Sequence, residues 1–144
     1  MNATETPTTS SRTVIDRLLQ ATNDHDLDAL VDCFASDYVN QTPVHPLRGF
    51  TGNEQVRLNW RQIFAAVPDL VAEVAARAEV GGTVWTEWQM AGTRGDGTPH
   101  LMRGVIIFTV QDNRISTARF YLEPVETSTG DVNTAVRAQM ANRP

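Results

Sequence analysis

The chain contains no lysine and only one cysteine, and these shortages exclude several kinds of protein. Binding to nucleic acid depends on clustered basic side chains that displace counterions from phosphates. Here the basic side chains are arginines scattered along a chain of net charge -5, so we expect no nucleic-acid partner. Cys33 has no second cysteine with which to form a disulfide within the chain.

Long apolar runs and metal-binding spacings are also missing. No run approaches the length of a membrane-spanning helix, and the polar residues 1–6 lack the apolar stretch of a signal peptide. These features predict a cytoplasmic protein with no membrane partner. The three histidines are scattered, and neither paired cysteines nor a His-Glu-x-x-His motif occurs, so the sequence predicts no metal site and no cofactor.

The remaining composition is that of one globular domain, because 41% of the 144 residues are hydrophobic and 20% are charged. We expect a disordered N-terminal segment over residues 1–11, in which Ser10 or Ser11 caps the following helix. The folded domain is predicted over residues 12–125. A tail over residues 126–144 contains a possible short helix.

Helical periodicity dominates the first half of the chain. Apolar side chains recur at helical spacing over residues 14–19 and again over residues 27–34, separated by the polar turn at residues 23–26. Residues 38–41 can form a short strand. A third helix is predicted from Asn53 until Pro68 closes it.

The second half of the chain changes to the period of strands. Four strands are predicted over residues 70–80, 84–92, 101–111 and 115–123, with turn residues between them. The sequence therefore predicts an α+β fold in which three N-terminal helices pack on a curved antiparallel sheet.

Five short motifs, in their order and spacing, resemble the SnoaL-like branch of the NTF2-like superfamily over roughly residues 12–125. They are Asn23-Asp24-His25-Asp26-Leu27-Asp28-Ala29-Leu30, Asp37-Tyr38-Val39-Asn40, Pro46-Leu47-Arg48-Gly49, Pro68-Asp69-Leu70 and Asn113-Arg114-Ile115. The resemblance implies a cone-shaped, cystatin-like barrel around an apolar pocket. Members include polyketide cyclases, ketosteroid isomerases, limonene-epoxide-hydrolase-like enzymes and binding proteins, so the fold alone does not select a function.

Several catalytic positions of these relatives carry other residues here. The general base of ketosteroid isomerases falls at Thr42, and their oxyanion tyrosine falls at Leu18. The acidic residue on the last strand of polyketide cyclases falls at Phe120. The resemblance therefore disfavours both mechanisms in their usual form.

Limonene-epoxide-hydrolase-like enzymes are matched only in part. Tyr38 and Asn40 match the Tyr-x-Asn pair that holds the attacking water. The Asp-Arg-Asp charge relay falls at Trp88, Met90 and Phe120, which cannot transfer protons.

The residues themselves supply a first group of candidates on the first strand. Tyr38 and Asn40 lie two positions apart, so they share one face and can orient one substrate oxygen or one water. The alternative is that Tyr38 is a core residue whose hydroxyl has a partner within the protein.

His100 and Asp69 are the candidates for proton transfer. His100 either exchanges protons inside the apolar pocket or lies on an exposed rim without a function. Asp69, if it packs against Trp60 and Phe64, has a raised pKa and acts as an acid or base; otherwise it is a turn residue.

Strand alternation divides the predicted sheet into a pocket face and an outer face. The side chains expected to hold the carbon skeleton of a ligand are Trp60, Phe64, Trp88, Met90, Met102 and Phe120. Charged and polar side chains of the outer face suggest cross-strand pairs or a homodimer contact; these are Glu87, Arg103, Arg119, Tyr121 and Glu123. A register slip of one residue would exchange the two faces.

Three functions fit this sequence. The first is a cofactor-independent acid/base enzyme that cyclises, isomerises or opens an epoxide in a hydrophobic small molecule. The second is a binding or accessory protein that holds such a ligand without chemistry, since the usual carboxylate bases are missing. The third is a protein-interaction module that uses the outer face of the sheet.

Overall fold

The computed structural model describes residues 10–127 and 130–141. Within these ranges it contains the helices α1 (Ser10–Asp24), α2 (Leu27–Asp32), α3 (Asn53–Ala66) and α4 (Val132–Ala141), with a short 3-10 helix η2 at Pro46–Arg48. The strands are β1 (Phe34–Gln41), β2 (Phe50–Thr51), β3 (Val71–Val80), β4 (Thr83–Thr93), β5 (Pro99–Gln111) and β6 (Arg114–Pro124).

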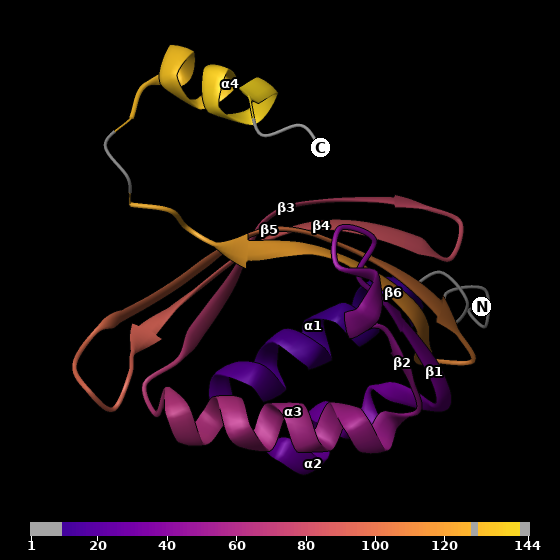
Figure 1. Ribbon diagram of the computed structural model, residues 1–144. Helices are drawn as coiled ribbons and strands as arrows, with labels where there is room; N and C mark the ends of the chain where they lie inside the picture. Colours follow the sequence, from indigo (N-terminus) through magenta and orange to yellow (C-terminus); the bar gives the residue numbers. More distant parts are fainter. Residues whose placement is uncertain (1–9, 128–129, 142–144) are drawn as a thin grey trace.

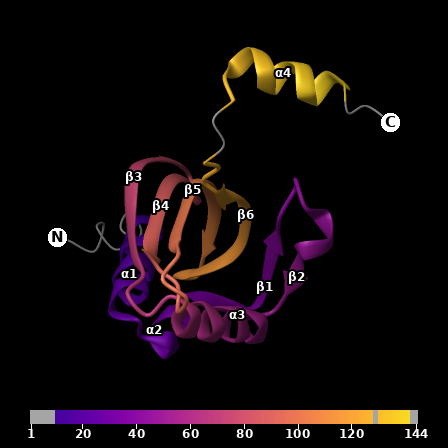
Figure 2. The ribbon, with the colours of Figure 1, turned by 60° about the vertical axis from the view of Figure 1, so that its left-hand side comes forward.

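One strongly curved sheet receives the first three helices on its concave side (Figure 1). Its strand order is β2-β1-β6-β5-β4-β3, and the sheet curves without closing into a barrel (Figure 2). The predicted α+β architecture is thus confirmed. The prediction of a wholly antiparallel sheet was wrong at one position, because β1 pairs with β6 in parallel. These strands are joined by about half of the chain rather than by a hairpin, so no local signal specifies their relative direction.

The first strand begins earlier than the sequence indicated. Phe34, predicted to end the second helix, is the first residue of β1, because α2 ends at Asp32. The backbone N–H of Ile115 donates to the carbonyl of Cys33 at 2.8 Å, which draws the chain into the sheet at this point. Phe34 is buried there, as it would also have been on a helix.

The N-terminal boundary also differs. α1 begins at Ser10, so the two serines expected to precede the helix are its first residues, and the side chain of Ser11 is buried. Residues 1–9 of the segment predicted to be disordered lie outside the described residues.

The polar turn between α1 and α2 anchors the helices to the sheet. The Asn23 side chain donates to the carbonyl of Ala72 at 2.9 Å and accepts from the N–H of the same residue at 2.7 Å. His25 Nε2 lies 2.9 Å from the carbonyl of Leu70, and the Asp26 carboxylate caps α2. This motif of the SnoaL-like resemblance therefore has a structural role in this chain.

Gly104 permits a close contact between β5 and β6. Its φ of 153° lies outside the range that other residues favour, and an added Cβ would collide with the backbone of Tyr121 and lie 2.8 Å from Cα of Leu122. The flanking residues Met102 and Leu122 face the interior cavity described below. The glycine thus brings the two strands together beside that cavity.

The helix α4 lies beyond the other face of the sheet (Figure 1). Its apolar side chains Val132, Val136 and Met140 recur every four residues and are exposed. Across the ranges that the structure describes, no helix has both the length and the apolar character needed to cross a membrane.

Candidate functional site

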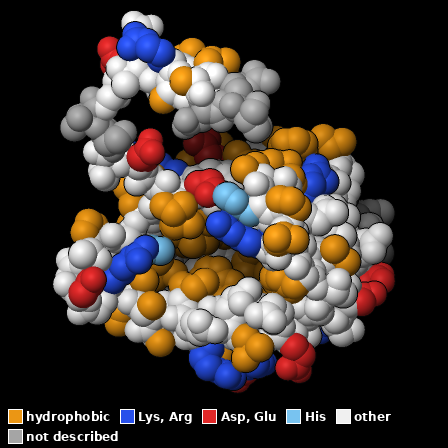
Figure 3. Space-filling model, viewed as in Figure 1, with side chains coloured by type: hydrophobic (Ala, Val, Ile, Leu, Met, Phe, Trp, Pro, Cys, Tyr) orange, Lys and Arg blue, Asp and Glu red, His pale blue; other side chains and the backbone are white. Residues whose placement is uncertain are grey.

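A cavity of about 380 Å³ lies between α3 and the concave face of the sheet. In the space-filling view, hydrophobic side chains line the hollow, and arginine and histidine side chains lie at its rim (Figure 3). The apolar wall consists of Phe34, Phe50, Val56, Trp60, Ile63, Met90, Met102, Phe120 and Leu122. The polar lining residues are Tyr38, Asn40, Thr42, Arg48, Asn59 and His100.

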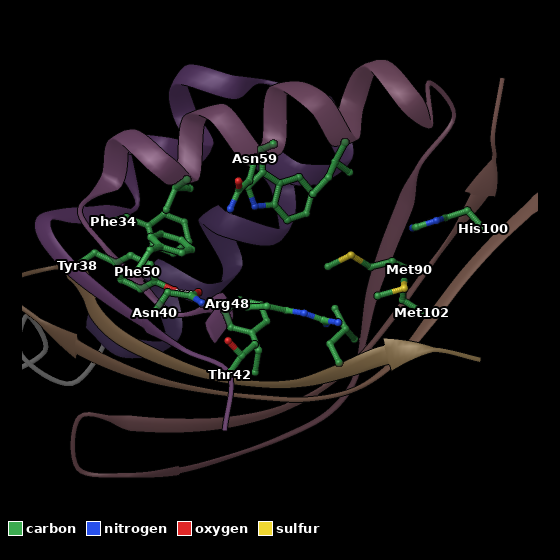
Figure 4. A pocket seen from close by; sticks show the side chains of 15 residues that line it. Phe34, Tyr38, Asn40, Thr42, Arg48, Phe50, Asn59, Met90, His100 and Met102 are labelled. Carbon is green, nitrogen blue, oxygen red and sulfur yellow. Dashed lines mark hydrogen bonds between the residues drawn. The ribbon is translucent and has the colours of Figure 1, made fainter. Parts of the chain in front are cut away.

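Tyr38 and Asn40 form a hydrogen-bonded pair at one end of this cavity (Figure 4). The Tyr38 hydroxyl donates to Oδ1 of Asn40 at 2.7 Å, and both side chains are buried. Burial raises the pKa of Tyr38 far above its ordinary value, so its hydroxyl remains protonated. The side-chain amide of Asn40 thus has its oxygen occupied, and its N–H₂ group is the part that can donate to a ligand.

Asn59, on α3, repeats this arrangement. Its Oδ1 accepts a hydrogen bond from Nε2 of Gln55 at 2.9 Å, one helical turn earlier. Figure 4 shows the Asn59 amide nitrogen turned toward the cavity. In the described parts of the chain, neither Asn59 nor Asn40 donates a side-chain N–H to another residue.

His100 points into the cavity from the end opposite Asn40 (Figure 4). Its Nδ1 lies 3.2 Å from Nη2 of Arg94, and because a guanidinium can only donate, Nδ1 is the acceptor. Burial and the neighbouring Arg94 charge lower the pKa of His100, so the ring is neutral at neutral pH. A neutral ring whose Nδ1 accepts must carry its proton on Nε2, which makes His100 a hydrogen-bond donor rather than a base.

Thr42 and Arg48 add two polar groups that the sequence did not single out as ligand contacts. Thr42 follows β1, and Arg48 ends η2 in the loop that returns the chain to β2. Both lie at the same end of the cavity as Asn40 (Figure 4). The Thr42 hydroxyl is buried and has no hydrogen-bond partner within residues 10–127 and 130–141.

Asp69 lies outside the cavity and has a structural role. Its Oδ1 accepts the backbone N–H of Thr93 at 2.7 Å. This hydrogen bond lowers the pKa of Asp69, so the raised pKa expected from contact with Trp60 and Phe64 was wrong. The reason is Gly92, whose missing side chain leaves room for the turn at residues 67–70 to lie against β4.

Two of the predicted ligand-holding residues lie elsewhere, whereas Trp60, Met90, Met102 and Phe120 line the cavity. Phe64 is absent from its lining and stacks on His25 with ring centroids 4.4 Å apart. Trp88 lies deeper, beside a separate void of about 20 Å³, and its Nε1 donates to the hydroxyl of Thr86 at 2.6 Å. Trp88 is therefore a core residue beneath the cavity floor.

The outer face of the sheet carries the polar side chains assigned to it. Glu87, Arg103 and Tyr121 are exposed, while Trp88, Ile106 and Ala118 of the other face are buried. The alternative register, in which the charged residues would form an active site, is thus wrong. Glu123 reaches the loop after β1 and lies 3.0 Å from Nε2 of His45.

The sequence contained only a weak signal for Arg48, Thr42 and Asn59. Arg48 belongs to the Pro46–Gly49 motif, but its approach to Asn40 depends on the pairing of Asn40 with Phe50 across the short strand β2. Asn59 directly precedes Trp60 on α3. Because the side chains of neighbouring helical residues diverge by about 100°, helical periodicity could have placed Asn59 at the border of the face that carries Trp60.

No cluster of three or more His, Cys, Asp or Glu side chains suited to a metal ion occurs in the described residues. Likewise, no Asp or Glu among those residues lines the cavity. The chemistry available in the described cavity is therefore hydrogen bonding from N–H and O–H groups, together with the charge of Arg48.

A comparison with protein-family profiles decides the family. The profile described as "SnoaL-like domain" matches residues 15–118. The chain belongs to the SnoaL-like domain family. A search of curated protein sequences found no match to this SnoaL-like protein.

Solved structures agree with this fold. An epoxide hydrolase from Mycobacterium tuberculosis, described as limonene-epoxide-hydrolase-like, is 20% identical, with 80% of this chain and 84% of that chain covered and a TM-score of 0.68. Another M. tuberculosis protein, in complex with estradiol-17beta-hemisuccinate, is 17% identical, with 78% and 92% covered and a TM-score of 0.67. An NTF2-like protein from Cytophaga hutchinsonii is 12% identical, with 78% and 89% covered and a TM-score of 0.60.

These comparisons confirm the resemblance to the SnoaL-like and NTF2-like proteins. Relatives with this fold include small-molecule enzymes. Because each of these structures is 20% identical or less, they establish the fold of the SnoaL-like protein, and its reaction has to be argued from its own cavity.

Proposed function

We propose that this SnoaL-like protein is a cofactor-independent enzyme that polarises an oxygen atom of a hydrophobic small molecule and so promotes its cyclisation, isomerisation or epoxide opening. One observation carries the proposal. Three polar side chains of the cavity each have their acceptor atom occupied by a donor within the protein, at 2.7 Å for Asn40, 2.9 Å for Asn59 and 3.2 Å for His100.

This arrangement leaves N–H groups for the ligand. Asn40, Asn59 and His100 come from β1, α3 and β5. Asn40 and His100 lie at opposite ends of the cavity, so they serve different polar groups of one ligand, and the polarised oxygen is assigned to the end that Asn40 forms (Figure 4). Preorganised donors stabilise negative charge that develops on an oxygen, as in an enolate or an opening epoxide. Their effect is larger in a largely apolar cavity than in bulk water, because fewer water molecules screen them there.

Proton removal from the substrate is assigned to water or to the substrate itself. Asp69 lies outside the cavity, and the accepting nitrogen of His100 is occupied by Arg94. The side chains of the protein thus lower the energy of the oxyanion. When solvent takes the proton, the C–H electron pair forms the C=C bond of the enolate, and the carbonyl π electrons move onto the oxygen.

The size and lining of the cavity support a hydrophobic ligand. Aromatic and thioether side chains from both the helix and the sheet, including Trp60, Met102 and Phe120, form most of its wall. The complex of the M. tuberculosis relative with an estradiol derivative indicates that a protein of this fold can hold such a molecule.

The test uses 2-acetylnaphthalene, a hydrophobic ketone whose methyl protons exchange with solvent through an enolate. Exchange in D₂O is followed by proton NMR with and without the protein. We expect the SnoaL-like protein to accelerate exchange, and Asn40→Leu to reduce the acceleration roughly tenfold or more. Arg103→Gln is the matched control, because Arg103 lies on the outer face of the sheet and pairs with Gln89.

A second function is supported by the lack of carboxylates in the described cavity lining: a protein that binds the same ligand without transforming it. The exchange assay separates the two functions. A ketone that binds to the cavity, shown by chemical-shift changes at Trp60, but exchanges at the protein-free rate identifies a binding protein and contradicts the proposed enzyme.

A further inference from the structure

The side chain of Arg48, an exposed residue, extends into the largely apolar cavity (Figure 4). Among the ion pairs of the described residues none includes Arg48. The carboxylate of Glu123, the penultimate residue of β6, lies 3.0 Å from Nε2 of His45 in the loop that also carries Arg48. The positive charge of Arg48 is thus available to a ligand.

A second group beside the same end of the cavity also lacks a partner. The hydroxyl of Thr42 is removed from solvent and makes no hydrogen bond within the described residues. A buried hydroxyl without a partner costs about 1–3 kcal/mol, and a ligand oxygen that bonds to it would recover this free energy. Thr42 and Arg48 lie on either side of the Pro43–Leu47 loop, so one loop positions both groups.

The surrounding cavity favours negative charge on the ligand. Asn40 lies at the same end of the cavity as Thr42 (Figure 4), and because its Oδ1 accepts from Tyr38, its N–H₂ group is the part that can donate to a ligand. No described Asp or Glu lines the cavity to repel an anion. Thr42 and Asn40 thus form one end of the cavity, and the Arg48 side chain extends from that end along the apolar wall toward Met102 (Figure 4).

We propose that Arg48 and Thr42 form a carboxylate subsite, so that the ligand of this cavity is a hydrophobic carboxylic acid. One guanidinium and one hydroxyl match a group with a single charge and two oxygens. A phosphate, with more oxygens and up to two charges, would need further cations, and Arg48 is the only Lys or Arg in the described lining. The subsite deepens the proposed function, on which it rests, by naming the substrate class.

The experiment compares the binding of a charged probe with that of its neutral analogue. 2-Naphthylacetate and 2-naphthylacetamide have the same ring and differ in charge, and their dissociation constants are measured by isothermal titration calorimetry at low ionic strength. We expect the acid to bind roughly tenfold more tightly than the amide. Equal affinity of the wild-type protein for the two probes would overturn the proposal.

Variants locate the preference. Arg48→Gln should abolish the preference, because the acid should bind more weakly while the affinity for the amide stays unchanged. Arg48→Lys should retain part of the preference. Thr42→Val keeps the side-chain shape and should lower the affinity for the acid severalfold. Arg103→Gln, on the outer face, should leave both affinities unchanged. A preference for the acid that survives Arg48→Gln would contradict the assignment.

The outcome is separable from that of the proposed enzyme function, because the exchange assay uses a neutral ketone. Accelerated ketone exchange without a preference for the acid refutes the carboxylate subsite alone. A preference for the acid that depends on Arg48, with no acceleration of exchange, supports the subsite and refutes the enzyme. Failure of all three probes to bind refutes both.

Discussion

The hydroxyl of Tyr38 donates a 2.7 Å hydrogen bond to Oδ1 of Asn40, two residues further along β1. Both side chains are nearly inaccessible, with 1% and 9% of their surfaces exposed. The bond uses the tyrosine proton and fixes the orientation of the amide. Tyr38 is therefore a positioning residue in this cavity, and Asn40 is the group that faces the ligand.

Tyr38→Phe should separate these two roles. The substitution leaves the buried Oδ1 of Asn40 without its donor, which we expect to lower the free energy of unfolding by about 1–2 kcal/mol. The released amide can rotate, so acceleration of ketone exchange should fall as well. Urea denaturation measures the first effect, and proton NMR measures the second.

Tyr121→Phe is the control for this substitution. Tyr121 is partly exposed on the outer face of the sheet and makes no side-chain hydrogen bond to the described residues. Loss of its hydroxyl should change neither stability nor exchange. An equal effect of the two substitutions would show that the Tyr38–Asn40 bond has no special role.

The protonation of His100 provides a second prediction. Because burial and Arg94 lower its pKa, an NMR titration should place the pKa of His100 below its ordinary value of about 6.5. Arg94→Gln removes the neighbouring positive charge and should move the pKa upward. The nitrogen shifts of the wild-type ring should identify the Nε2–H tautomer at neutral pH. A proton on Nδ1 would contradict the role of His100 as a donor toward the cavity.

Strand patterns allowed most of the sheet to be predicted. β3 through β6 begin and end within two residues of the predicted bounds, because apolar alternation and turn residues are local features. The same alternation placed Met90, Met102 and Phe120 correctly on the cavity wall. Helix α3 followed from its apolar stripe and from Pro68.

The errors arose where long-range contacts decide the structure. The parallel pairing of β1 with β6 joins segments that lie far apart in the sequence. Asp69 was a candidate acid or base if it packed against Trp60 and Phe64, and a turn residue otherwise; it lies in the turn and accepts the backbone N–H of Thr93. Arg48 reaches the cavity because a two-residue strand returns its loop to β1, and so short a strand has no readable period.

The role of Asp69 can be tested by the pH dependence of stability. Its folded-state pKa is depressed, so its contribution to stability is present above the unfolded-state pKa and is lost as the pH falls through the folded value. Asp69→Asn should therefore lower the melting temperature slightly at neutral pH. This difference should shrink as the pH falls below about 4.

Ketone exchange should not respond to Asp69→Asn. A loss of exchange comparable to that of Asn40→Leu would show that Asp69 acts in the reaction, contrary to its position outside the cavity.

Gly104→Ala tests the close approach of β5 and β6. The new methyl group would meet the backbone of Tyr121 and Leu122, at a φ that alanine disfavours. We expect the free energy of unfolding to fall by about 1–3 kcal/mol or more. Gly95→Ala is the matched control, because a Cβ at Gly95 has no atom within 4 Å, and it should leave stability nearly unchanged.

The central claim is that the cavity donates hydrogen bonds to a ligand oxygen. The carbonyl ¹³C shift of 2-acetylnaphthalene, labelled at that carbon, measures this directly, since hydrogen bonding moves the resonance downfield. We predict a bound shift further downfield than in hexane that moves back toward the hexane value in Asn40→Leu. If the ketone occupies the cavity of the wild-type protein and its carbonyl ¹³C shift equals the value in hexane, the cavity does not donate hydrogen bonds to the ligand oxygen and the central claim is wrong.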